Sequence, residues 1–275
     1  MSVASSPIGV FDSGVGGLSV LRALRVELPN EHFVYVADSG HAPYGERDDS
    51  HVIARAHAIT DYLIKMHDIK ALVVACNTAT ATAIQQLRAT YPVLTIIGIE
   101  PALKPAILTS KTGIVGVMAT RGTLRSEKFG VLLNALAGKA QFVLQACDGL
   151  ADAIEQADAI KIEAACAYYK GAMGTFGSKV GEIDTLVLGC THYPFIEADL
   201  RSHVGPQVTF LEGGAPVARQ TRKVLAAAGT LKGADGTEPH APWPTFFTTG
   251  NAQALQMAVH RWLGWDVGAV ALRAV

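Results

Sequence analysis

Short apolar runs alternate with longer amphipathic stretches along the chain, and this alternation is the strongest structural signal in the sequence. The stretches between the runs carry apolar residues at helical spacing, as at Leu18, Leu21 and Leu24. Strands are predicted at 8–11, 33–37, 71–75, 93–99, 113–118, 141–146, 186–188, 208–211 and 245–248, with an edge strand within 267–275. Helices are predicted at 18–28, 50–67, 102–108, 150–156, 160–170, 216–227 and 252–262. Such alternation predicts an α/β fold with parallel sheets and right-handed crossovers.

Polar residues follow the predicted strands at the point where each strand ends, and two of them are cysteines. Cys76 follows the apolar run 71–75, and Cys190 follows the run 186–188 after one glycine. Ligands of parallel sheets bind beyond the carboxyl ends of the strands, so chemistry is expected there. The residues gathered at these ends are Asp12, Ser13, Asp38, Tyr44, Gly45, Cys76, Asn77, Thr78, Thr120, Cys190, Thr191 and His192.

The sequence DSGVGG at residues 12–17 links the first strand to its helix. Its glycines permit positive φ and close backbone approach, and the free N–H groups at a helix start can bind an anion. The segment matches neither G-x-G-x-x-G nor a P-loop, so it does not favour a nucleotide site. Two interpretations stay open: the loop is an anion pocket, or its glycines serve only to let the turn pack.

Composition narrows the class of protein. The 275 residues are 49% hydrophobic and 17% charged, which suits an α/β enzyme and excludes a disordered or fibrous chain. Lys and Arg number 23 against 24 Asp and Glu, so no charge excess favours a nucleic acid or a membrane surface as partner. The expected ligand is a small molecule.

Cysteine usage and the first residues favour a cytoplasmic protein without a metal site. The four cysteines include no C-x-x-C pair, so we expect neither structural zinc nor a disulfide framework. No apolar stretch reaches the length of a membrane span, about 18 residues. The starting sequence MSVASSPIGV lacks the basic and apolar regions of a signal peptide.

Cys76 and Cys190 differ in context from the other two cysteines. Each is predicted where a strand meets the amino terminus of a helix, whose partial positive charge stabilises a thiolate. Cys147 and Cys166 are interpreted as small hydrophobic residues. Two thiols that face each other across a cleft suit inversion at one carbon, whereas a single cysteine with a histidine suits acyl transfer. Spacing alone leaves both reactions open.

Several motifs, in order along the chain, carry a family resemblance. They are IGVFDSGVGGLSV at 8–20, YVADSGHAPYG at 35–45, VVACNTATA at 73–81, GVMATRGTLRS at 116–126, LVLGCTHYPF at 186–195 and FFTTGN at 246–251. With these motifs the chain resembles the glutamate racemases of the cofactor-independent aspartate/glutamate racemase superfamily. The resemblance implies that L- and D-glutamate are interconverted by proton transfer at the α-carbon, without a cofactor, to supply D-glutamate for peptidoglycan.

The resemblance also implies roles for individual residues. Cys76 and Cys190 are the two catalytic acid/base residues. Asp12 lies near the first thiol and His192 near the second, so they are expected to tune them, and Glu155 is expected to orient His192. The residues expected to contact the amino acid are Asp12, Ser13, Tyr44, Gly45, Asn77, Thr78, Thr120, Thr191 and His192.

The implied architecture is two similar α/β domains with mainly parallel sheets flanked by helices and the active site in the cleft between them. From the return of the chain we assign residues 1–99 plus 212–275 to the first domain and 100–211 to the second. A homodimer is the family expectation. Two departures from the family pattern lie outside the catalytic positions, namely Asp148 where proline is frequent and Glu212-Gly213-Gly214 in place of an Asp-Ser-Gly-like turn.

Three alternatives remain on sequence grounds. A related racemase of the same superfamily would act on aspartate or a hydantoin. A cysteine-dependent amidase or lyase would use Cys190 with His192 and leave Cys76 structural, so that hydrolysis would survive the loss of Cys76. An amino-acid sensor on the same scaffold would bind its ligand without turnover.

Overall fold

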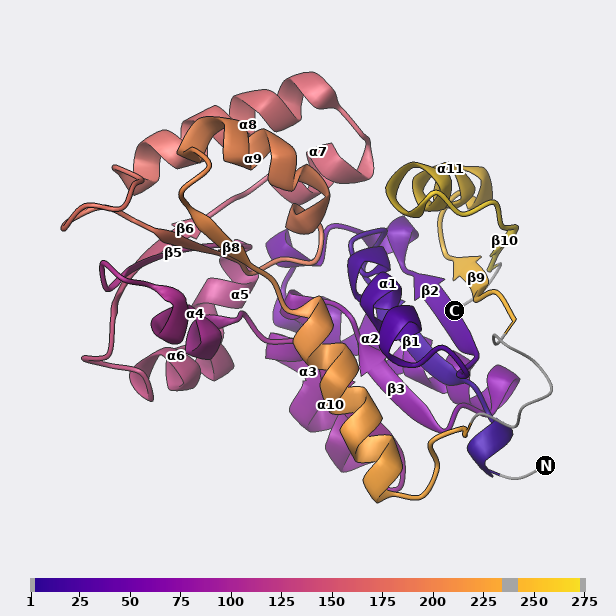
Figure 1. Ribbon diagram of the computed structural model, residues 1–275. Helices are drawn as coiled ribbons and strands as arrows, with labels where there is room; N and C mark the ends of the chain where they lie inside the picture. Colours follow the sequence, from indigo (N-terminus) through magenta and orange to yellow (C-terminus); the bar gives the residue numbers. More distant parts are fainter. Residues whose placement is uncertain (1–2, 234–241, 273–275) are drawn as a thin grey trace.

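The computed structural model describes residues 3–233 and 242–272, which form two parallel sheets flanked by helices (Figure 1). The larger sheet has the strand order β10-β9-β2-β1-β3-β4, and the smaller sheet has the order β6-β5-β7-β8. Every neighbouring pair within these two sheets is parallel, which confirms the predicted α/β fold. The strands are β1 Ile8–Asp12, β2 Phe33–Ala37, β3 Ala71–Val74, β4 Thr95–Gly98, β5 Ile114–Ala119, β6 Gln141–Ala146, β7 Thr185–Leu188, β8 Thr209–Leu211, β9 Thr245–Thr248 and β10 Ala269–Ala271.

Helices cover both faces of each sheet. They are α1 Leu18–Glu27, α2 Asp49–His67, α3 Asn77–Thr90, α4 Leu103–Thr109, α5 Arg121–Arg125, α6 Glu127–Asn134, α7 Leu150–Glu155, α8 Ala159–Met173, α9 Glu197–Val204, α10 Gly214–Ala227 and α11 Ala252–Leu263, with 3-10 turns η1 Val3–Ser5, η2 Ser39–His41, η3 Tyr44–Glu46 and η4 Tyr193–Ile196. On the larger sheet, α1, α10 and α11 pack on one face and α2 and α3 on the other. On the smaller sheet, α7, α8 and α9 pack on one face and α4 and α6 on the other.

The central strands are buried on both faces, which explains their unbroken apolar sequences. Side chains alternate between the two faces of a strand. On β1, Val10 belongs to the core under α1 and α10, whereas Phe11 belongs to the core under α2 and α3, and both are fully buried. A strand covered in this way needs apolar residues at every position rather than at every second one.

One strand is shorter than its apolar run suggested, and two predicted segments are only partly described. A strand was expected over 93–99, but β4 begins at Thr95 and Val93 is 98% exposed. Pro92 has no N–H for a sheet ladder, and it forms a turn with Val93 instead. The loop predicted at 229–243 and the edge strand predicted within 267–275 extend onto residues outside the described ranges, although β10 lies in the described part.

We call the larger sheet with its helices the first half and the smaller sheet with its helices the second half. Strands of the first half come from residues 8–98 and 245–271, and strands of the second half come from 114–211. Helix α10 returns the chain to the first half, where it packs against α1 (Figure 1). The exact domain limits, 1–99 plus 212–275 and 100–211, stay a prediction.

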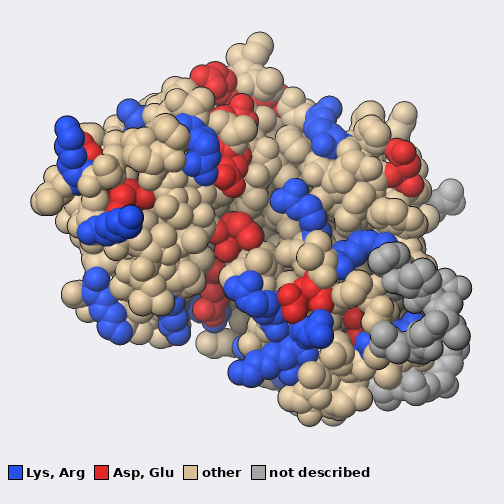
Figure 2. Space-filling view, in the orientation of Figure 1, with Lys and Arg blue, Asp and Glu red and all other residues tan. Residues whose placement is uncertain are grey.

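Acidic and basic side chains are intermixed on the face of the molecule shown in Figure 2. In the described ranges, no helix combines the length and the apolar character that crossing a membrane requires.

A buried ion pair lies at the amino ends of β2 and β3, away from the strand ends that carry the cysteines. Lys70 Nζ is 2.6 Å from Glu31 Oε2, and the two side chains are 0% and 2% exposed. The ammonium also donates to the carbonyl oxygens of Ala4 and Thr230, each at 2.8 Å, and the backbone N–H of Lys232 donates to Glu31 Oε1 at 2.8 Å. Charge and hydrogen bonds are therefore matched around both ions.

Replacing Lys70 with methionine is expected to lower the free energy of unfolding by about 3–5 kcal/mol, because the Glu31 carboxylate would be left buried without its cation. Urea denaturation followed by circular dichroism measures the change. Lys65→Met is the matched control, since its pair with Asp61 is exposed and should contribute only about 0.3–0.5 kcal/mol. Equal losses in the two variants would contradict the structural role of the buried pair.

Candidate active site

The carboxyl ends of the two sheets meet around one small cavity, which brings together most of the residues predicted from strand ends. Its volume is about 20 Å³, room for about one water molecule. It is lined from the first half by Ser13, Pro43, Tyr44, Gly45, Glu46, Cys76, Asn77 and Thr78, and from the second half by Thr120, Cys147, Asp148, Ala151, Cys190, Thr191 and His192. Of the predicted site residues, Asp12 and Glu155 are absent from the lining and act on it through their neighbours.

Cys76 is held at the start of α3. It is the N-cap residue of that helix, and its Sγ accepts the backbone N–H of Ala79 at 3.5 Å. The thiol also lies 3.8 Å from the hydroxyl of Ser13. Burial raises the pKa of the Cys76 thiol well above its ordinary value, the carboxylate of Asp12 raises it further, and the N–H of Ala79 opposes both. The surroundings of this sulfur therefore favour the protonated thiol.

Asp12 ends β1 and is fully buried next to Cys76. Its Oδ2 accepts the backbone N–H groups of Gly17 at 2.9 Å and Gly14 at 3.3 Å. Burial raises the pKa of this carboxyl group, Glu155 adds to the rise, and His192 and the N–H of Gly17 oppose it. Its Oδ1 is buried without a conventional hydrogen-bond partner among the described residues, and the neighbouring Cys76 thiol acts on this carboxyl group as a weak donor that lowers its pKa.

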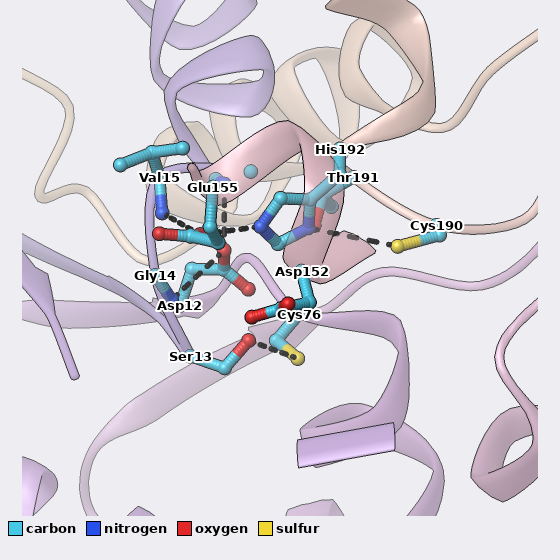
Figure 3. Close-up of polar contacts among 12 residues, drawn as sticks. Asp12, Ser13, Gly14, Val15, Cys76, Asp152, Glu155, Cys190, Thr191 and His192 are labelled. Atoms are coloured by element: carbon cyan, nitrogen blue, oxygen red, sulfur yellow. Dashed lines mark hydrogen bonds and ion pairs between the residues drawn. The ribbon is translucent and has the colours of Figure 1, made fainter. Parts of the chain in front are cut away.

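His192 links the second thiol to Glu155 (Figure 3). Its Nδ1 lies 3.6 Å from Cys190 Sγ, and its Nε2 lies 2.5 Å from Glu155 Oε1. Burial opposes a positive charge on the imidazole, but the bonds to Cys190 and Glu155 outweigh it and raise the pKa of His192 well above its ordinary value. A buried imidazolium therefore faces the sulfur of Cys190.

Two interpretations of the DSGVGG loop were left open by its sequence, an anion pocket and a turn whose glycines allow packing. The structure shows features of both. The N–H groups of the loop do bind anions, but these are protein carboxylates: Asp12 within the loop and Glu155 from the second half, whose Oε1 accepts the N–H of Val15 at 2.5 Å. The glycines are also needed for packing. A Cβ on Gly14 would lie 1.9 Å from Glu155 Oε1, and one on Gly16 would lie 2.3 Å from Nδ1 of His192.

Tyr44 lines the cavity, and its hydroxyl is held by a carboxylate. The hydroxyl donates to Asp38 Oδ2 at 2.5 Å. Arg55 donates to both oxygens of Asp38, each at 2.9 Å, and so fixes the carboxylate that holds the tyrosine. The strand-end residue Asp38 thus supports the loop at Tyr44-Gly45 from outside the cavity.

Hydroxyl groups join the halves on the other side of the cavity. Thr78 Oγ1 at the start of α3 lies 2.9 Å from Thr120 Oγ1. Thr120 caps α5 by accepting the N–H of Thr123 at 3.2 Å. A Cβ on Gly45 would lie 2.6 Å from Cβ of Thr120, so a glycine is needed where the two halves come closest here.

Five residues that line the cavity were not predicted as site residues, and Cys147 is the one that carries a thiol. It is 2% exposed, and its thiol donates to the carbonyl of Gln145 at 3.5 Å. Burial raises the pKa of this thiol, which keeps it protonated and fits its interpretation as a small hydrophobic residue. The sequence did contain a signal for Cys147, because this residue, like Cys76, directly follows a predicted strand. The other four are Pro43, Glu46, Asp148 and Ala151.

The two departures from the family pattern have structural explanations. Asp148 pairs with Arg121 at the edge of the cavity, and the next N–H, that of Gly149, donates to Glu46 Oε1 of the first half at 3.0 Å. Glu212 caps α10, because its carboxylate accepts the N–H groups of Gly214 and Ala215. Neither departure disturbs the thiols. Within residues 3–233 and 242–272, no group of His, Cys, Asp and Glu side chains is arranged to hold a metal ion.

Comparison with known proteins places the chain among racemases. The family model described as Asp/Glu/hydantoin racemase matches residues 8–221. A glutamate racemase from Ectopseudomonas mendocina is 44% identical over 264 residues, which cover 96% of this chain and 97% of that protein. Among solved structures, a glutamate racemase from Bacillus anthracis is 32% identical with a TM-score of 0.84, covering 97% of both chains. A glutamate racemase from Thermus thermophilus in complex with β-chloro-D-alanine is 30% identical with a TM-score of 0.79, covering 99% of this chain and 98% of that one.

Proposed function

The chain belongs to the Asp/Glu/hydantoin racemase family, and we propose that it interconverts L- and D-glutamate by moving the α-proton between two thiols. The observation that carries this proposal is a single cavity lined by Cys76 from one half and Cys190 from the other. Each sulfur has an ionisable partner of its own, Asp12 for Cys76 and His192 for Cys190. A hydrolase with a single cysteine nucleophile would not need both Cys76 and Asp12 beside the cavity.

The surroundings of the two sulfurs are electrostatically opposite, which suits an acid and a base. Nδ1 of His192 lies 3.6 Å from Cys190 Sγ, and the pKa of this imidazole is raised by its bonds to Cys190 and Glu155. Cys76 lies beside a buried carboxyl group that favours its protonated form. Cys190 then removes the α-proton from one face of the substrate while Cys76 gives a proton to the other face. The reverse reaction exchanges these roles.

The remaining lining residues suit an amino acid with two carboxylates. Loss of the α-proton sends negative charge into the α-carboxylate, so fixed donors around it stabilise the transition state. Donors of this kind on the lining are Asn77, Thr78 and Thr191. Asp12, which the resemblance expects to contact the amino acid, would reach it only when the halves separate, because it is fully buried and does not line the cavity. Ser13 and the backbone at Gly45 would supply donors to the side-chain carboxylate.

The size of the cavity indicates that the halves move during turnover. Since a volume of about 20 Å³ has room for about one water molecule, we infer that the halves separate for substrate entry and close for reaction. Domains at 1–99 plus 212–275 and 100–211 would provide this motion. By analogy with the family, we propose a cytoplasmic homodimer that supplies D-glutamate for peptidoglycan, and light scattering of the purified protein tests the dimer.

The substrate assignment is tested by incubating the purified protein with L-glutamate alone and following the enantiomers by chiral chromatography. Equal amounts of L- and D-glutamate are expected at equilibrium without any added cofactor. L-Aspartate and a substituted hydantoin serve as competing substrates. Faster turnover of either would replace glutamate as the substrate, and ligand binding without turnover of any of the three would favour the sensor.

Replacing Gly16 with alanine is expected to lower the rate of racemisation about 10²-fold, because the added Cβ would displace the ring of His192 from Cys190. The variant should still fold, which circular dichroism checks. Gly130→Ala is the control, since a Cβ there meets nothing within 4 Å. This control should keep full activity. An unchanged rate in the Gly16 variant would contradict the role given to the position of His192.

A further inference from the structure

Ser19 joins the two halves directly behind the cavity. It lies in the first turn of α1, is 5% exposed and does not line the cavity. Its hydroxyl is 2.8 Å from the carbonyl oxygen of Thr191 in the second half and 2.8 Å from that of Gly16 in the DSGVGG loop. A hydroxyl has one proton, so the two carbonyl groups share it. One hydroxyl thus connects the backbone that joins Cys190 to His192 with the DSGVGG loop, in which the N–H of Gly17 donates to Asp12.

We propose that Ser19 is a positioning residue, which fixes Cys190 and His192 relative to the thiol of the first half. The carbonyl of Thr191 stands between the two functional side chains, so holding it sets the direction of both. This inference rests on the proposed two-thiol racemisation and names one residue that makes it possible. The position of Ser19 on the apolar face of α1 does not by itself explain why a hydroxyl group stands there.

Cys76 and Cys190 differ in how far their own structural elements fix the positions of their thiols. Cys76 is the N-cap of α3, a helix of 14 residues, and its own helix fixes its place. Cys190 is followed by two turn residues and the short 3-10 segment η4 of 4 residues. Within this segment the carbonyl oxygens of Cys190 and His192 accept the backbone N–H groups of Tyr193 and Phe195, and the carbonyl of Thr191 between them accepts from Ser19. Loss of the Ser19 hydroxyl should therefore disturb Cys190 more than Cys76.

Residues of the DSGVGG loop also contact the second half close to Ser19. Val15 donates its N–H to Glu155, and Gly16 is packed so closely against His192 that a Cβ would not fit. Ser19 follows on the next turn and contacts the residue before His192. Three contacts thus connect the DSGVGG loop and the first turn of α1 to Glu155, His192 and Thr191 of the second half.

The test is the Ser19→Ala variant, with Thr221→Val as the matched control. Thr221 is also a fully buried hydroxyl on a first-half helix packed against α1, but it donates to the carbonyl of Val217 within its own helix. Ser19→Ala is expected to lower kcat/KM roughly tenfold. Because the two enantiomers have equal free energy, kcat/KM must fall by the same factor in both directions. Thr221→Val should leave it unchanged.

Isotope effects then show which thiol is affected. With α-deuterated L- and D-glutamate, the substrate isotope effect should rise in the direction in which Cys190 removes the proton and should not rise in the other. A general loss of structure would change the thermal midpoint and leave the two isotope effects in their original ratio, which would overturn the proposal. An unchanged kcat/KM in Ser19→Ala would overturn it as well. Failure of the unaltered protein to racemise glutamate would instead overturn the proposed function.

Discussion

Alanine at Cys76 or at Cys190 is expected to lower racemisation by about 10²–10⁴-fold or more in both directions, because each thiol serves as the acid in one direction and the base in the other. Rates are measured by circular dichroism of the glutamate enantiomers. The two variants should also differ from each other: each should still exchange the α-proton of one enantiomer with solvent, and the enantiomer should be a different one in each case.

The control for these variants is Cys166→Ala. Cys166 is buried in α8 within the core of the second half and does not line the cavity. Its loss should cost about 1 kcal/mol of stability and leave turnover unchanged. If Cys76→Ala retained the activity of the unaltered protein, a single-nucleophile reaction at Cys190 would be the better account.

Glutamine at Glu155 is expected to reduce kcat about 10²-fold and to move the alkaline limb of the pH–rate profile to lower pH. Glutamine keeps the shape of the side chain but removes the charge that helps to raise the pKa of His192. The imidazolium would then lose its proton at lower pH, and with it the cation that faces Cys190. The profile is measured by initial rates between pH 6 and about 10, a range that spans the ordinary values of His and Cys.

Glu155→Gln should also change how the free energy of unfolding depends on pH, in a direction that follows from the pKa of His192. A histidine whose pKa is raised by folding stabilises the native state below its unfolded value of about 6.5, and this contribution is lost as pH rises through the folded value. In Glu155→Gln the loss should be complete at a lower pH than in the unaltered protein, because the pKa of His192 in the folded state is lower. Glu163→Gln is the control, because Glu163 pairs with His203 at 3.0 Å but its side chain is 60% exposed. Parallel shifts in both variants would show that the effect is general rather than specific to His192.

The fold and the positions of the thiols could be predicted from the sequence because they follow from local pattern. Unbroken apolar runs identify strands covered on both faces, and parallel strands direct their carboxyl ends to one edge. Cys76 and Cys190 therefore belonged to that edge before any contact was known. The strand at 93–99 was predicted too long, since the exposed Val93 is as apolar as a buried valine.

The contacts between the halves could not be predicted from local pattern. Glu155 is 140 residues from Val15 in sequence, and its role was expected only from the family resemblance. Glu46 lies on a short 3-10 turn whose sequence gives no periodic signal. Ser19 reads as one more residue of an amphipathic helix until Thr191 is seen beside it. Such contacts depend on how two separately packed cores meet, which no single segment encodes.

The central claim is that two different thiols serve the two faces of the α-carbon, and one measurement tests it most directly. Protiated L-glutamate is incubated with the protein in deuterium oxide, and both enantiomers are separated and analysed by mass spectrometry at low conversion. The two-thiol account predicts that nearly all of the D-glutamate carries deuterium at the α-carbon while the remaining L-glutamate stays protiated. D-Glutamate that retains the original α-proton would show that one group moves the proton between both faces, and would contradict the account.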